Sequence, residues 1–268
     1  MKKIILYLSA IALISFIQSC KKNDAVPGPP DYNQPNGSCI VTQTTDAASL
    51  GLFGDLDFVY NANGNPRSLN GFVTYSYDTK GRLVKDSSSQ YTLTITYKDE
   101  TFLPAATYRR VTSTNALVQT ILYTYDNARK VIKTNLLYAY GASQGEIIWK
   151  YTYDANNNIQ TIIDPVSGDT IIKVKSYDNK PNFLWGNQWI KYILNDPTSG
   201  YFPQNYFLFS VNNPLEWSIN DNRSGLIIPV VNAYYTYNSK GFAIKDSVVF
   251  RDPAGDFEGV QTSVFTCY

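Results

Sequence analysis

The chain has 268 residues, enough for one large all-β domain or two small ones, and a formal net charge of +1. Its lysines are scattered, which argues against the clustered basic face of a nucleic-acid-binding protein, and we expect no nucleic-acid partner. It contains no histidine, the commonest general base and zinc ligand, whereas its 22 tyrosines, 13 phenylalanines and 4 tryptophans favour β-strands.

The first 19 residues predict a signal peptide. Two lysines precede the apolar run from Ile4 to Ile17, which is short for a membrane span. The run ends in Ile17-Gln18-Ser19-Cys20, which resembles the lipobox of bacterial lipoproteins. This resemblance implies cleavage before Cys20 and acylation of that cysteine, so that the membrane is a partner through the lipid. The alternative is an ordinary secretory peptide followed by an incidental cysteine.

Residues 20–37 predict the lipidated cysteine and a disordered tether, because this segment is rich in proline and has little to bury. Lys21-Lys22-Asn23-Asp24 resembles the charged tag of some surface-exposed Bacteroidota lipoproteins. We therefore expect an outer-membrane lipoprotein, with the periplasmic and the surface-exposed face both open. Residues 38–268 are expected to form one domain.

A repeated β-hairpin organises this domain. In Tyr75–Lys85 two tyrosines alternate with small polar residues, Asp78 opens a turn, and Gly81 closes it in the left-handed conformation. This register places Tyr77 opposite Leu83. Further copies begin at Tyr123, Tyr151 and Tyr235, and weaker ones at Phe58 and Lys175.

The expected fold class is all-β: a curved antiparallel meander of repeated hairpins that forms a closed or nearly closed, barrel-like sheet. The cleanest strand is Tyr91–Tyr97, in which apolar residues alternate with three threonines. The repeat breaks after Tyr177 and returns at Tyr234. We expect residues 179–231 to be an aromatic-rich insertion within the one domain.

The Tyr-x-Tyr-Asp-x-x-Gly pattern resembles YD repeats, and the chain is similar to uncharacterised, lipid-anchored, tyrosine-rich β-proteins of Bacteroidota. Two further motifs carry this resemblance: Asp178-Asn179-Lys180-Pro181-Asn182-Phe183 and Ser210-Val211-Asn212-Asn213. It implies a curved meander, porin-like in one related group, and no activity or cofactor. Arg129 and Asn157 replace the turn glycine, which suggests looser or different turns there.

Two kinds of acidic site are conceivable. A glycan hydrolase needs two converging carboxylates, and the spacing selects no pair among the candidates Asp55, Asp57, Glu146, Glu216, Asp256 and Glu258. Asp252, Asp256 and Glu258 place three oxygen ligands on one tight loop and are a weak calcium candidate, although a solvated hairpin tip explains them equally well.

Aromatic residues of the expected insertion are the candidates for ligand binding: Trp185, Trp189, Tyr192 and Trp217. They lie among amide side chains, and flat aromatic faces beside amides suit sugars or peptides. The alternative, which we favour, is that they fill the inside or the open end of the sheet.

Cys39 and Cys267 stand at the two limits of the strand-rich region. An exported chain meets an oxidising compartment, so we predict a disulfide between them that links the first and last strands. The alternative is two free thiols at frayed ends.

The expected function is a non-enzymatic, lipid-anchored envelope protein that binds or scaffolds a glycan or a protein. The first alternative is the glycan hydrolase, and the second is a membrane-spanning barrel. The barrel alternative is disfavoured because Lys150, Lys173 and Lys175 interrupt the strands where an apolar outward band is needed.

Overall fold

The computed structural model describes residues 39–46, 56–62, 65–140, 143–182, 192, 207, 209–222, 225–252 and 255–267. The chain divides into two compact units, Met1–Asp31 and Tyr32–Tyr268, and all described residues belong to the second. The predictions for the signal peptide, Cys20 and the tether therefore lie outside the described residues. Within the described part, no helix is long and apolar enough to cross a membrane.

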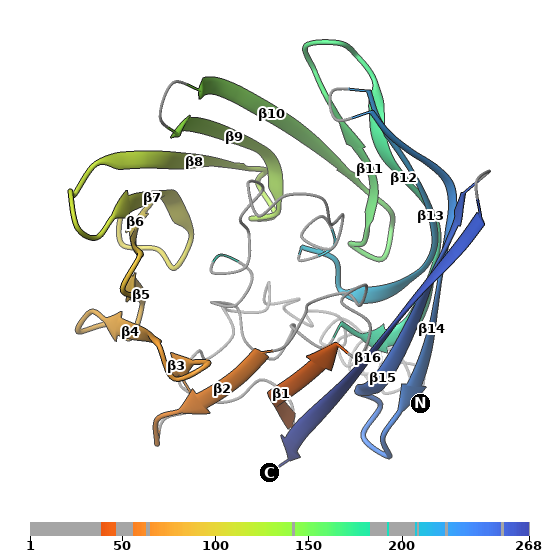
Figure 1. Ribbon diagram of the computed structural model, residues 1–268, viewed down its shortest axis with the longest axis horizontal. Helices are drawn as coiled ribbons and strands as arrows, with labels where there is room; N and C mark the ends of the chain where they lie inside the picture. The colour runs from red at the N-terminus through yellow and green to blue at the C-terminus, as the bar shows by residue number, and fades with distance from the viewer. Residues whose placement is uncertain are drawn as a thin grey trace, which may run out of the picture. The chain divides into compact units, whose positions relative to one another are not determined.

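The second unit is built of β-strands that follow one another around a ring (Figure 1). Their bounds are β1 (Cys39–Asp46), β2 (Leu56–Tyr60), β3 (Pro66–Leu69), β4 (Val73–Tyr77), β5 (Leu83–Ser87), β6 (Tyr91–Tyr97), β7 (Pro104–Val111), β8 (Leu117–Tyr125), β9 (Val131–Tyr140), β10 (Ser143–Tyr153), β11 (Ile159–Ile163), β12 (Thr170–Pro181), β13 (Asn212–Asp221), β14 (Leu226–Tyr237), β15 (Ala243–Asp252) and β16 (Gly255–Cys267).

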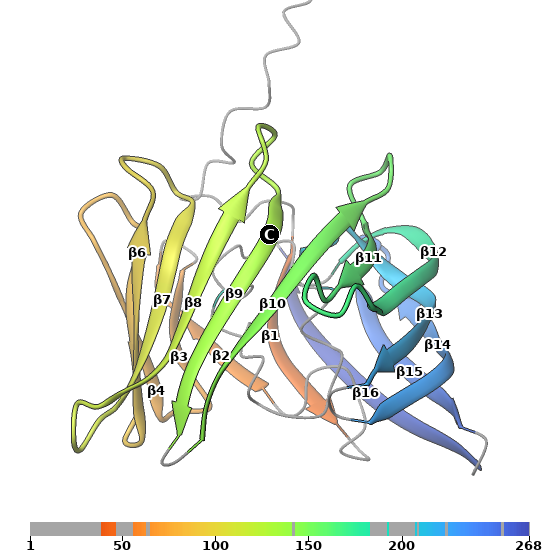
Figure 2. The ribbon, with the colours of Figure 1, turned by 90° about the horizontal axis from the view of Figure 1, so that it is seen from above.

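The sheet is an antiparallel meander that closes on itself. Each strand pairs with its neighbours in the sequence, and β1 pairs with β16, so the ring of strands forms a closed barrel. Seen from the side, the strands run obliquely to the barrel axis (Figure 2), as closure of a sheet requires. The predicted all-β, barrel-like fold is confirmed.

The break in the meander is shorter than predicted. Residues 179–231 were expected to form an insertion, but β13 and the first part of β14 are regular barrel strands within that range. Only residues 182–211 separate β12 from β13. The prediction failed because β13 carries Trp217, not a Tyr-x-Tyr pair, on its inward side.

The turn that follows each Tyr-x-Tyr segment is held by one Asp or Asn side chain. In the first copy, the backbone N–H groups of Lys80 and Arg82 each donate to Asp78 Oδ1 over 2.9 Å. Gly81 has φ +77° and Tyr77 pairs with Leu83, both as predicted. A register shift follows the turn, and such a bulge bends the strand and increases its twist.

Arg129 and Asn157 occupy the glycine position of this turn in two other copies. The prediction of looser or different turns there is wrong, because their φ angles are +65° and +66°. The Arg129 N–H donates to the Asp126 carbonyl oxygen over 3.0 Å, as Gly81 does to Asp78. The Lys130 N–H also donates to Asp126 Oδ1 over 2.8 Å, so the turn keeps its hydrogen bonds and its left-handed residue without glycine.

In five hairpins, the tyrosine before the turn ties its hairpin to the preceding one. Its hydroxyl donates to the carbonyl oxygen of the residue that begins the preceding hairpin's second strand, over 2.5–2.8 Å. Burial raises the pKa of all five hydroxyls well above the ordinary value, so they remain donors. The pairs in this tyrosine ladder are Tyr77–Pro66, Tyr97–Leu83, Tyr125–Pro104, Tyr153–Val131 and Tyr177–Ile159.

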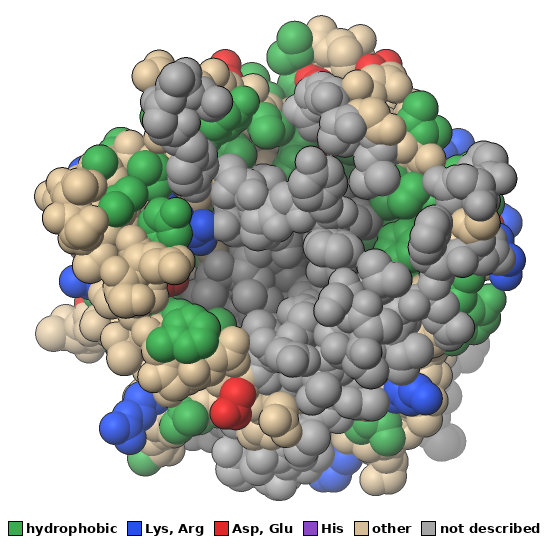
Figure 3. Space-filling model, viewed as in Figure 1, with side chains coloured by type: hydrophobic (Ala, Val, Ile, Leu, Met, Phe, Trp, Pro, Cys, Tyr) green, Lys and Arg blue, Asp and Glu red, His purple; other side chains and the backbone are tan. Residues whose placement is uncertain are grey.

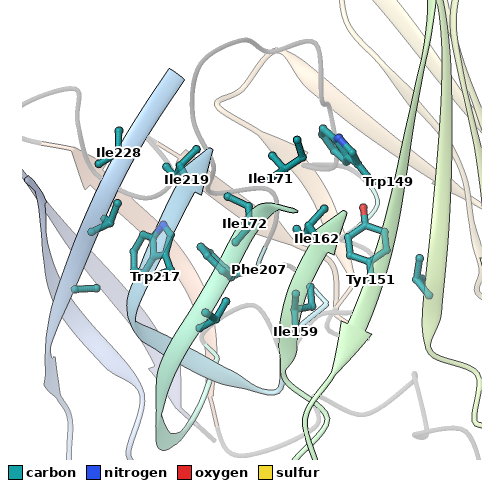
Figure 4. Close-up of a cluster of buried hydrophobic side chains, with 14 of the residues drawn as sticks. Trp149, Tyr151, Ile159, Ile162, Ile171, Ile172, Phe207, Trp217, Ile219 and Ile228 are labelled. Atoms are coloured by element: carbon teal, nitrogen blue, oxygen red, sulfur yellow. The ribbon is translucent and has the colours of Figure 1, made fainter. Parts of the chain in front are cut away.

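Inward-facing side chains form two hydrophobic cores. The smaller one lies on β2–β6 and includes Phe58, Leu83 and Leu93. The larger one lies on β8–β15 and includes two buried aromatic residues from outside the strands, Tyr192 and Phe207. Figure 4 shows Phe207 beside Trp217, among isoleucines of β11–β14. The aromatic cluster therefore belongs to the inside of the barrel.

The two sequence motifs at the break form a hydrogen-bonded clasp. Asp178 accepts hydrogen bonds from the backbone N–H and the Nδ2 group of Asn213, over 3.1 and 3.0 Å, and from the Tyr237 hydroxyl. The Asn182 N–H donates to the Val211 carbonyl oxygen over 2.8 Å. Asn182 and Asn213 are buried with these partners, so the clasp holds the two ends of the break together beside β14.

Candidate functional site

One row of polar side chains crosses the inner wall from β4 to β9. Cross-strand partners face the same side of a sheet. The register joins Tyr75 to Asp86, Asp86 to Leu93, Leu93 to Arg109, Arg109 to Gln119 and Gln119 to Tyr138. Tyr75 and Leu93 belong to the smaller core, so the whole row faces inward. We call Tyr75, Asp86, Arg109, Gln119 and Tyr138 the polar row.

The polar row combines an acid, a base and aromatic rings. The Leu93 N–H donates to Asp86 Oδ1 over 3.1 Å, and the Arg109 guanidinium lies 5.8 Å from the ring centre of Tyr91, an attractive cation–π arrangement. Asp86, Tyr91 and Arg109 remain partly exposed, whereas Leu93 between them is 4% exposed. Donors, acceptors and aromatic rings are thus within reach of a solute on this wall.

The carboxylate of Asp86 in the polar row is partly removed from water, and this changes its pKa. Burial raises the pKa of Asp86 from 3.8 to about 6, and the Leu93 N–H and the Arg109 charge act in the opposite direction. Burial also raises the pKa of Tyr75 well above its ordinary range, with the Asp86 charge as the next cause. A perturbed carboxyl beside an arginine on a concave wall is typical of a functional site.

A second inward aspartate stands in the corresponding place of the last hairpin. Asp246 is 5% exposed and pairs with Tyr235, as Asp86 pairs with Tyr75. Both follow a turn Gly and precede a serine in Lys-Asp-Ser. Their strands, β5 and β15, lie on opposite sides of the ring in Figure 1, so the two carboxyls do not converge on one small ligand.

Neither inward aspartate is among the site residues predicted from the sequence. The bulge after each turn makes the first and fourth residues of the second strand face inward, so simple alternation misplaces Asp86 and Asp246. The available signal was the repeat itself: Lys85-Asp86-Ser87 recurs as Lys245-Asp246-Ser247 at the same distance from the Tyr-x-Tyr pair.

The aromatic binding candidates have different positions. Tyr192 and Trp217 are 9% and 2% exposed. The Tyr192 ring packs edge-on against Tyr123 at 5.3 Å, and Trp217 meets Phe207 at 4.9 Å. Both side chains therefore lie inside the barrel, as expected if they fill the inside of the sheet. Trp185 and Trp189 lie outside the described residues, and ligand binding by these four residues stays a prediction.

The described acidic candidates do not converge. Asp57 and Glu146 are exposed, and Glu146 accepts a hydrogen bond from Asn135 Nδ2 over 2.7 Å. Glu216 forms an ion pair with Lys175 over 2.7 Å. Asp55 lies outside the described residues.

Calcium binding by Asp252, Asp256 and Glu258 stays a prediction. Their strands, β15 and β16, are adjacent, with Asp252 paired to Gly255, but their side chains are not described. Among the described residues, no group of three or more acidic, cysteine or histidine side chains is placed to hold a metal ion.

The two cysteines are brought together by closure of the barrel. Cys39 and Cys267 are direct partners in the pairing of β1 with β16, so the predicted neighbourhood of the first and last strands is confirmed. Directly opposed Cα atoms in an antiparallel pair are about 4.5–5.5 Å apart, within the range that a disulfide spans. The disulfide itself stays a prediction.

Comparison with known proteins gives only distant structural similarity. No protein-family model and no protein of curated function matches the sequence. A crystal structure of a porin-like protein from Bacteroides vulgatus is 14% identical, with 84% of this chain and 98% of that one covered and a TM-score of 0.41. A porin-like protein from Bacteroides uniformis is 11% identical, with 84% and 97% covered and a TM-score of 0.44.

A toxin assembly is a further distant match. The Tc holotoxin pore of Photorhabdus luminescens is 11% identical, with 77% of this chain and 13% of that one covered and a TM-score of 0.30. What this chain does must therefore be inferred from its own side chains.

Proposed function

We propose that this chain is a lipid-anchored protein of the bacterial cell envelope that works by binding a glycan, and that the glycan lies against the polar row. The apolar run that ends at Cys20 supports the anchor and the exported location. β1 begins at the end of the barrel that carries the Tyr-x-Tyr turns, so a tether would join the domain there.

The outer wall supports a barrel that faces water. Outward positions on β5, β10, β12 and β15 carry the exposed lysines Lys85, Lys150, Lys173, Lys175 and Lys245. Figure 3 shows Lys and Arg side chains mainly around the outside of the ring. A membrane-spanning barrel needs an apolar outward band, and charges there are costly. The inside of this barrel, by contrast, is largely apolar.

The polar row carries the proposal for binding. Sugar hydroxyls require donors and acceptors, and the partly exposed Asp86 and Arg109 provide both beside the Tyr91 ring. Taking a charged group out of water costs stability unless it is paired, and isoleucine fills corresponding inward positions elsewhere in the barrel. A binding role accounts for the polar side chains on this part of the inner wall, where other parts carry isoleucine.

The hydrolase is the second candidate. It would require two carboxyls about 5–10 Å apart. Of the described candidates, Glu146 and Glu216 lie outward with partners of their own, and Asp86 and Asp246 lie on opposite walls. We therefore favour binding without turnover.

The test is a glycan array probed with the Tyr32–Tyr268 unit, which contains both described cores. Arg109→Ala and Asp86→Asn should each weaken binding at least about tenfold, the effect of losing a hydrogen bond to a charged group. Lys85→Ala is the matched control, because Lys85 precedes Asp86 and faces outward. An equal loss of glycan binding in Lys85→Ala would contradict the proposal, and so would binding to a peptide array but not to the glycan array. Release of a product from a bound glycan would decide for the hydrolase.

A further inference from the structure

Two lysines oppose each other directly on the outer wall. Lys133 of β9 and Lys150 of β10 are cross-strand partners, and Lys150 is exposed. Lys173 of β12, two strands farther along, also faces outward. It pairs with Thr161 of β11, which pairs with Thr152 of β10. Lys173 therefore lies in the row of Thr152, one outward row nearer the Tyr-x-Tyr turns than Lys150. Three ammonium groups therefore gather on one side of the barrel.

This arrangement is unfavourable for the protein by itself, since like charges directly opposite in a sheet repel. Elsewhere on the same wall, Lys175 is neutralised by an ion pair with Glu216 over 2.7 Å. Among the described residues, no carboxylate lies within ion-pair distance of Lys133, Lys150 or Lys173. A negatively charged partner would remove the repulsion.

The next outward row carries two apolar side chains, one on each side of an asparagine. Leu122 and Ile148 both pair with Asn135, the outward neighbour of Lys133 along β9. Leu137 follows one row farther, and Leu122 and Leu137 are 39% and 41% exposed. Glu146 shares the row of Leu137 and is hydrogen-bonded to Asn135. Ammonium groups thus lie beside exposed leucine side chains.

We propose that this face lies on the phosphate-bearing headgroups of an anionic membrane, with the barrel on its side. We call it the docking face and define it by Lys133, Lys150, Lys173, Leu122, Leu137 and Ile148. Ammonium groups next to exposed leucine side chains match the phosphate and acyl boundary layers of a bilayer, as in interfacial helices. A soluble polyanion satisfies the lysines but leaves the leucines in water.

The inference is independent of the polar row, because the docking face is on the opposite side of the wall. The test measures sedimentation of the Tyr32–Tyr268 unit with neutral phosphatidylcholine vesicles and with vesicles containing about 30% phosphatidylglycerol, at about 0.1 M salt. We expect binding to the anionic vesicles only. Lys133→Gln with Lys150→Gln should lower the partition coefficient about twenty-five-fold, since each lysine near an anionic surface contributes about fivefold.

The controls separate this face from net charge and from other polyanions. Lys85→Gln with Lys245→Gln removes the same charge from β5 and β15 and should lower vesicle binding less than threefold. Leu137→Ser keeps the charge but removes an apolar contact with the bilayer, so it should also weaken vesicle binding. Equal losses in the two lysine pairs would show that only net charge matters and would overturn the proposal. So would absence of vesicle binding, or binding to soluble polyphosphate that Leu137→Ser leaves unchanged.

Discussion

The inner wall of the barrel has two parts that are built from the same repeated hairpin but differ in their inward-facing side chains. On β10–β14, inward positions carry Ile162, Ile172, Trp217 and Val231, all at most 2% exposed. On β5 and β7, equivalent positions carry the partly exposed charged residues Asp86 and Arg109. The tyrosine ladder and the Asp turn occur in both parts. The repeat therefore determines the backbone of the barrel, whereas its inward-facing residues can vary.

One position of the repeat shows this directly. The residue opposite the first tyrosine of a hairpin is Asp86, Thr134, Ile162 or Asp246. The bulge after the turn always aims this residue inward. A single site in each repeat therefore decides whether that sector of the wall is core or polar surface.

The largest expected effect tests the apolar part. Trp217→Ala removes a fully buried indole that packs against Phe207, and should lower the free energy of unfolding by about 3–5 kcal/mol. Arg109→Ala, in the polar part, should change it by less than about 1 kcal/mol, because Arg109 is partly exposed. Urea unfolding of both variants checks this. A stable Trp217→Ala variant that has lost only ligand binding would mean that Trp217 is a binding residue after all.

The second prediction concerns the seam that joins β1 to β16. If Cys39 and Cys267 are bridged, Cys39→Ser should destabilise the domain by about 2–5 kcal/mol under oxidising conditions. Adding a reductant should bring the parent to the stability of the variant. Thermal unfolding of both proteins with and without reductant provides the measurement, and a parent indifferent to reductant indicates free thiols.

Much of this scaffold could be predicted from the sequence. Tyr-x-Tyr-Asp carries its own turn chemistry, so the hairpins, the register of Tyr77 with Leu83 and the approach of Cys39 to Cys267 follow from local pattern and closure. The polar row could not be predicted, because it joins residues from five strands, β4, β5 and β7–β9, through a register that each bulge shifts. The assignment of residues 179–231 to an insertion failed for a related reason: β13 pairs regularly although it lacks the repeat's tyrosines.

The third prediction uses the acid of the polar row. The pKa of Asp86 is raised in the folded state, so its contribution to stability is fully present below about pH 3.8 and is lost as pH rises through about 6. A rise from 3.8 to about 6 corresponds to at most about 3 kcal/mol, and partial exposure reduces this. Asp86→Asn should therefore be more stable than the parent at pH 7 and equal to it near pH 4. Urea titrations at both pH values decide, and a parallel pH dependence in the two proteins would contradict the burial of Asp86.

The smallest effect is expected in a turn common to both parts. Arg129→Gly relieves a positive φ of +65° that Gly81 adopts without strain, and should stabilise the domain by about 1 kcal/mol. Asn157→Gly should gain less, because asparagine tolerates this conformation. Melting temperatures measured side by side suffice, and a loss of stability in Arg129→Gly would show that the arginine side chain has a role of its own.

The most direct test of the two-part wall is its access to solvent. With the native cysteines replaced by serine, single variants Asp86→Cys and Ile162→Cys are treated with a charged maleimide under native conditions. Asp86 is partly exposed and Ile162 is 0% exposed, so the first variant should be labelled at least about tenfold faster. Equal protection of both cysteines would mean that the polar row is sealed inside the barrel, and would contradict its role as a binding site.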